Sequence, residues 1–259
     1  MATQLATAPS AFVPERRFYF IMACVMAFVL VAGFSASIVL HRSTFASPII
    51  YHIHAFTFFG WIVLYMMQTW LGATGSIALH KRLGWLAVIW VPAMVVLAVT
   101  MTAFTVHTTG APFFFDQNEF LFGNWLGILA FAGLVGWAIG LRRRTDWHQR
   151  LMLCAMASIT GPGWGRILPS PLFMPWAYWV VSFVFPAFFV CAGMIADRRR
   201  IGRVHPAYVY GIAAMAGSML LGDAIAYSPV GYAVTHAVID GGAGAARPMH
   251  AGWPHKAKP

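Results

Sequence analysis

The chain has 259 residues, of which 60% are hydrophobic and only 9% are charged. A soluble domain carries charge on about a quarter of its residues, so this composition excludes a soluble globular protein. The net charge of +10 comes from short basic clusters between long apolar blocks. That arrangement is typical of membrane topology, and we expect no nucleic-acid partner.

Seven apolar segments follow one another along the chain, and we expect them to cross a bilayer whose core takes about 20 residues of helix. The fifth segment ends in the run Gly161-Pro162-Gly163-Trp164-Gly165, and the third and sixth contain Pro92 and Pro186. The segments cover residues 18–40, 50–71, 83–106, 120–141, 151–165, 172–196 and 207–226. The sequence therefore predicts an all-α fold, a polytopic membrane helix bundle of about seven transmembrane helices.

Lysine and arginine gather in alternate loops between these segments. The clusters lie at residues 16–17, 81–82, 142–150 and 198–203. By the positive-inside rule, this alternation predicts a bacterial inner (plasma) membrane protein with a cytoplasmic N-terminus and an extracytoplasmic C-terminus. We expect a cytoplasmic leader at residues 1–17, a seven-helix transmembrane domain at 18–227 and a flexible extracytoplasmic tail at 228–259.

Histidines lie near both membrane surfaces, at the ends of predicted helices. A haem b with two histidine ligands needs two imidazoles at equal depth on neighbouring helices. The candidate pairs are His54 with His107 on the outer side and His80 with His148 on the inner side. Arg82 and Arg150 each follow an inner histidine by two residues, and a guanidinium binds a carboxylate such as a haem propionate through two hydrogen bonds.

The outer histidines also permit a metal site. His52, His54 and His107 offer imidazole nitrogens, and Asp116 and Glu119 in the next outer loop offer carboxylate oxygens. This donor set suits zinc, copper or iron. A histidine at a helix end is also common without any ligand role, so the metal, the haem and the purely interfacial interpretations all stay open.

The second predicted helix carries a polar and aromatic face. His54, Trp61, Tyr65 and Gln68 are spaced 7, 4 and 3 residues apart, so they share one side of a helix. We expect this face to point into the bundle, because Gln68 would be unsatisfied in lipid. Tyr65 and Gln68 either line a functional site or simply bond to neighbouring helices.

Two further charges lie inside or beside apolar segments. Arg166 follows the glycine-rich end of the fifth segment, and Asp223 lies toward the outer end of the seventh. Both are expected on the outer side, where an ion pair between them would either lock helices together or take part in proton or substrate binding.

Three short segments resemble a bacterial family of multi-pass membrane proteins of unknown function that is distantly similar to cytochrome b561. They are Tyr51-His52-Ile53-His54-Ala55, Leu79-His80-Lys81-Arg82-Leu83-Gly84-Trp85 and Trp147-His148-Gln149-Arg150-Leu151-Met152, followed by Arg166. Similarity to cytochrome b561 implies paired histidine ligands on central helices. The chain differs from that pattern in placing its histidines at helix ends.

These observations favour an integral membrane redox protein that binds haem b or a quinone and transfers electrons. Two alternatives belong to other classes. One is a small-solute or proton-coupled carrier that uses the polar face of the second helix with Arg166 and Asp223. The other is a structural subunit of a larger membrane complex. The expected partners are the lipid bilayer and either a membrane protein or a second copy of the chain.

Overall fold

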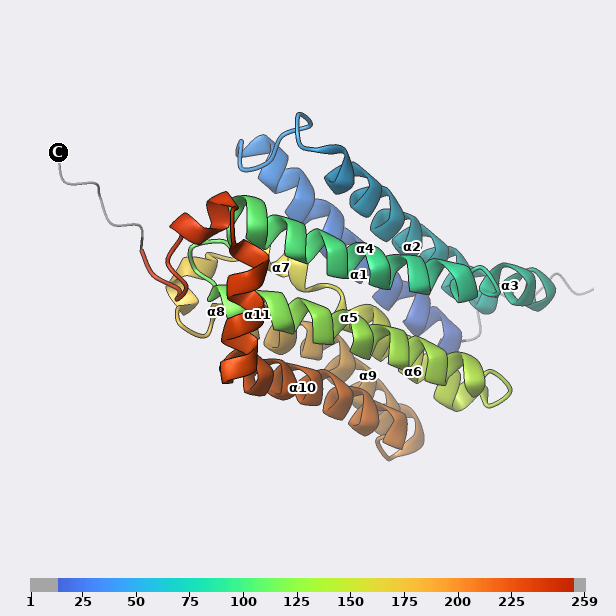
Figure 1. Cartoon of the computed structure of the whole chain (residues 1–259). Coiled ribbons are helices and arrows are strands. Elements are labelled where there is room, and N and C mark those ends of the chain that lie inside the picture. Colours follow the sequence, from blue (N-terminus) through green and yellow to red (C-terminus); the bar gives the residue numbers. More distant parts are fainter. Residues whose placement is uncertain (1–13, 254–259) are drawn as a thin grey trace, which may run out of the picture.

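The computed structural model describes residues 14–253, and all regular secondary structure in that range is helical (Figure 1). Within it, six helical segments are long and apolar enough to cross a membrane. They are α1 (Pro14–Val39), α2 (Ile49–Ala73), α4 (Ala87–Thr109), α5 (Gln117–Gly140), α10 (Pro206–Ala226), and one continuous segment made of α8 (Ala177–Trp179), η2 (Val180–Val184) and α9 (Phe185–Ile201). The predicted all-α membrane bundle is therefore confirmed.

The fifth predicted segment is broken and lies in the middle of the bundle. It forms α6 (Thr145–Ser158) and α7 (Gly161–Ile167). α6 packs against α1, α5, α9 and α10, and its side chains from Leu153 to Ala157 are almost wholly buried. The break precedes Pro162, which has no amide hydrogen and disfavours helical geometry at the residue before it.

The proline of the sixth predicted segment is accommodated by a change of helix type. The π-helical turn η2 lies directly before Pro186, which stands in the first turn of α9. A proline removes one backbone hydrogen bond of a helix, and a local π turn is a common way to absorb that loss.

The two ends of the bundle differ in charge. One end, here called the basic end, carries the start of α1, the short helix α3 (Ile77–Gly84), and the α5–α6 and α9–α10 connections (Figure 1). These segments contain Arg16, Lys81, residues 142–144 and residues 198–200. The basic clusters from which the membrane orientation is predicted therefore all lie at one end of the bundle. The opposite end is here called the capped end.

The capped end is covered by the C-terminal segment, which differs from the predicted flexible tail. α11 (Pro229–Ile239) runs across the ends of α10, α5 and α4, and η3 (Ala243–Ala246) follows it (Figure 1). The Gln117 side-chain amide donates to the carbonyls of Gly244, Arg247 and Pro248 at 3.1 to 3.3 Å. Residues 229–253 of the predicted tail thus contain helices with defined contacts to the bundle, and residues 254–259 lie outside the described part.

Glycines allow the closest helix contacts. A Cβ on Gly33 of α1 would lie 2.5 Å from the backbone oxygen of Gly163 in α7. A Cβ on Gly123 of α5 would lie 2.3 Å from a ring carbon of Tyr178 in α8. Small residues are the usual means by which membrane helices approach closely.

Gly33→Ala should therefore destabilise the bundle by about 1–3 kcal/mol, because backbone cannot move aside for the added methyl group as a flexible side chain would. Thermal unfolding in detergent, followed by size-exclusion chromatography, measures the effect. Gly127→Ala is the matched control, since a Cβ there meets no atom within 4 Å. Equal unfolding midpoints for the two variants would contradict the α1–α7 contact.

Candidate functional site

The structure brings His80 and His148 together at the basic end. Their ring centroids lie 6.3 Å apart, and the ring planes are nearly perpendicular at 89°. His80 lies in α3, beyond the turn that follows α2, and His148 lies in the first turn of α6. The sequence predicted two histidine pairs, and the rings of this inner pair lie within contact distance of each other.

Each imidazole of this pair is held by a backbone carbonyl. Nδ1 of His80 lies 3.1 Å from the Gln68 oxygen, and Nδ1 of His148 lies 2.8 Å from the Ala138 oxygen. A carbonyl only accepts, so Nδ1 of His148 donates its proton and its Nε2 keeps a free lone pair. Histidines that bind metals are oriented in this way. Nδ1 of His80 has a second neighbour, the side-chain amide of Gln68 at 2.7 Å, to which it is an acceptor. Among residues 14–253, the hydrogen bonds of both rings are made through Nδ1 and not through Nε2.

The protonation state of His80 also suits a ligand. Burial lowers the pKa of His80, and the positive charges of Arg16 and Lys81 lower it further, against the opposing effect of the Gln68 carbonyl. The imidazole is therefore neutral at pH 7, the form that binds a metal.

Gln68 fixes the turn that carries His80. In the orientation that satisfies both of its polar atoms, the side-chain amide donates to Nδ1 of His80 at 2.7 Å and to the His80 carbonyl at 3.0 Å, and it accepts from the Gly84 amide at 3.1 Å. Gln68 thus bonds α2 to α3. Tyr65 and Trp61 of the same helix face are buried, 3% and 2% exposed, so this face points inward as its spacing predicts.

Arg150 binds a carboxylate of the protein itself. Its Nε and Nη2 atoms lie 2.7 and 2.8 Å from the two oxygens of Asp197 in α9, and its Nη1 atom donates to the Asp146 carbonyl at 2.8 Å. The Arg150 side chain is 3% exposed and that of Asp197 is 0% exposed. The sequence predicted that Arg150 binds a haem propionate, but its guanidinium is already paired with the buried Asp197 carboxylate. Arg82, the other predicted propionate ligand, is exposed at the same end.

Sequence reasoning missed Asp197, although one signal for it exists. Asp197 is the single acidic residue directly before Arg198, Arg199 and Arg200, at the boundary of an apolar helix. A charge at that depth needs a partner. The sequence alone does not say which of the many arginines provides it.

The outer histidines lie apart. His54 stacks on Phe58, with centroids 4.2 Å apart, and lies beside the backbone of Leu97. His107 stands ten residues after Leu97 in α4, roughly 15 Å further along the helix axis, and its Nδ1 lies 2.9 Å from the Val238 oxygen of α11. His54 and His107 therefore differ in depth.

No metal centre is assembled from the other outer candidates. Nε2 of His52 lies 3.1 Å from the carbonyls of both Phe45 and Ser47. Asp116 caps α5, accepting from the Asn118 and Glu119 amides at 2.8 and 3.2 Å. Within residues 14–253, no group of three or more His, Cys, Asp or Glu side chains has a geometry that holds a metal ion.

The predicted ion pair between Arg166 and Asp223 is wrong, because each side chain has another partner. The Arg166 guanidinium carbon lies 4.0 Å from the centre of the Phe34 ring, and Nη1 donates to the Pro162 carbonyl at 2.8 Å. Asp223 accepts a 2.7 Å hydrogen bond from the indole of Trp179. α7 packs on α1 while α10 packs on α5, and this separates the two charges.

Asp223 does have an acidic neighbour in the capped half. Glu119 of α5 is 5% exposed, and its charge interacts with that of Asp223. The sequence pointed to both residues separately and did not pair them.

The chain matches no family model, no curated protein and no solved structure.

The buried ion pair makes a quantitative prediction. Asp197→Leu should destabilise the protein by about 3–5 kcal/mol, because it leaves the Arg150 charge buried without its partner. The double variant Arg150→Met with Asp197→Leu should recover most of that loss, since it removes both charges. Thermal unfolding of the two variants in detergent measures this. A double variant no more stable than the single one would contradict the pairing.

Proposed function

We propose that this integral membrane protein transfers electrons through a haem b at its basic end, which His80 and His148 would hold. The observation that carries the proposal is the separation of the two rings, 6.3 Å between centroids. An imidazole nitrogen coordinates a metal at about 2 Å and lies roughly 1 Å from its ring centre, so two imidazoles on opposite sides of one metal have centroids about 6 Å apart.

The surroundings of the two histidines support the same assignment. His80 and His148 come from α3 and α6 and are held by carbonyls of α2 and α5, so four helices fix the two rings. Nδ1 of His148 donates to a carbonyl, which leaves its Nε2 for the iron. His80 would present its Nε2 in the same way once its Nδ1 donates to the Gln68 backbone carbonyl instead of accepting from the Gln68 side-chain amide. Bound haem supplies reversible one-electron chemistry, and the protein sets its potential through ligands, charge and burial.

Positive charge at the basic end suits the haem propionates. Arg82 and Lys81 are exposed next to His80, and Arg142 lies over the ring of Trp85 at 5.5 Å. Arg150 stays with Asp197 and acts as a structural residue that holds the start of α6 in place. If the positive-inside rule applies, this end faces the cytoplasm of a bacterial cell, and electrons pass between that side and a quinone or a partner protein in the membrane.

A proton-coupled carrier is the second candidate, favoured by one observation. Glu119 of α5 and Asp223 of α10 both lie in the capped half of the bundle, on two helices that pack against each other. Ionisable groups within a membrane bundle often mark proton pathways. The Trp179 indole holds one Asp223 oxygen at 2.7 Å, so the other oxygen is available for a proton.

The haem proposal predicts a spectrum. Protein expressed with a haem supply and purified in detergent should show a Soret band and, after dithionite, a sharp α band. His80→Ala and His148→Ala should each lose most of the bound haem, because each removes one axial ligand. His52→Ala is the control, since His52 lies at the opposite end and bonds to loop carbonyls. A colourless wild type at full protein loading would contradict the proposal.

The carrier candidate predicts proton flux. In liposomes under an imposed potassium diffusion potential, the wild type should acidify the lumen faster than empty vesicles, and Asp223→Asn should remove most of that excess rate. Asp240→Asn is the control, because Asp240 is an exposed carboxylate at the same end. A wild-type rate equal to that of empty vesicles rejects a proton carrier.

A further inference from the structure

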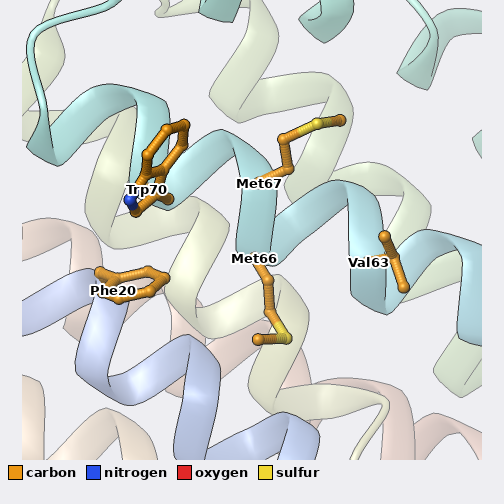
Figure 2. A pocket seen from close by; sticks show the side chains of 5 residues that line it. All are labelled: Phe20, Val63, Met66, Met67 and Trp70. Carbon is orange, nitrogen blue, oxygen red and sulfur yellow. The ribbon is translucent and has the colours of Figure 1, made fainter.

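An apolar groove lies between α1 and α2 in the half of the bundle nearest the basic end. Its volume is about 340 Å³, and Phe20, Val63, Met66, Met67 and Trp70 line it (Figure 2). In the close view Phe20 of α1 faces Trp70 and Met66 of α2. Val63 is 64% exposed and Trp70 is 45% exposed in the described chain, so the groove opens outward from the bundle.

Two arginines stand beside Phe20 on α1. Arg16 precedes Phe20 by four residues and therefore shares its side of the helix. Nη1 of Arg16 donates to the Gly72 carbonyl at 3.1 Å, which places the guanidinium beside the last turn of α2, two residues beyond Trp70. Arg17, three residues before Phe20, is exposed. The groove thus has apolar walls and a cationic rim at its basic end.

We propose that this groove binds one anionic phospholipid from the leaflet at the basic end. An acyl chain fits the apolar walls, and the phosphate group accepts hydrogen bonds from Arg16 and Arg17. A guanidinium is the side chain best suited to a phosphate, and basic residues at a membrane surface favour anionic lipids. A tryptophan such as Trp70 near a helix end is typical of the level of the lipid headgroups.

The bound lipid would join α1 to α2 next to the turn that carries His80. The Arg16 charge already acts on His80, so the headgroup would lie near the proposed haem ligands. The lipid site itself rests only on the groove and the arginines, and it stands or falls independently of the haem.

Native mass spectrometry of delipidated protein tests the proposal with two probes, phosphatidylglycerol and phosphatidylcholine of identical acyl chains. We expect the wild type to bind the first phosphatidylglycerol more tightly than phosphatidylcholine. Arg16→Gln with Arg17→Gln should weaken phosphatidylglycerol binding roughly tenfold to thirtyfold and leave phosphatidylcholine binding nearly unchanged. Met66→Trp, which fills the groove, should weaken the binding of both lipids.

Arg198→Gln with Arg199→Gln is the matched control, because it removes the same charge from exposed positions on α9 at the same end. Equal binding of the two lipids by the wild type would overturn the proposal. An equal loss in the control variant, or unchanged phosphatidylglycerol binding in Met66→Trp, would overturn it too. So would a stoichiometric quinone recovered from purified protein that phosphatidylglycerol does not displace.

Discussion

The buried ion pair between Arg150 and Asp197 organises the basic end of this bundle. Two charges taken out of water are costly unless their hydrogen bonds are complete, and here the guanidinium meets both carboxylate oxygens at 2.7 and 2.8 Å. The pair joins α6 to α9, and Glu15 brings α1 to the same guanidinium. α6 is thereby held at the centre of the bundle, and His148, two residues before Arg150, is directed to His80.

Glycine contacts pack the centre of the bundle, the C-terminal segment covers one end, and the candidate binding residues lie at the other end. Glycine contacts let α7 approach α1 and let α5 approach α8, so the central broken helix is enclosed. The segment 229–253 covers the capped end, where the Gln117 amide and the His250–Asp116 pair, at 2.7 Å, hold it. The His80–His148 pair and the cationic groove rim both lie at the basic end.

The features that depend on a local sequence pattern, namely the apolar helices and the position of the inner histidines, could be predicted from the sequence. Apolar blocks of membrane length predicted the bundle, and the basic clusters beside His80 and His148 placed both histidines on the inner side. Long-range partners were not predictable in this way. Arg150 was assigned to a ligand because Asp197, 47 residues away, carries no local mark of its partner. The tail rich in glycine and alanine gave no periodic signal, yet backbone carbonyls and Gln117 order it.

The central proposal is that His80 and His148, whose ring planes lie 89° apart, would together hold one haem iron. Electron paramagnetic resonance of the oxidised, haem-loaded protein tests this most directly. We predict a low-spin ferric signal with large g anisotropy, because perpendicular imidazole planes leave the iron orbitals nearly degenerate. The small fraction of haem that His148→Ala retains should give a high-spin signal. A purely high-spin wild type, or a low-spin signal unchanged in His148→Ala, would contradict it.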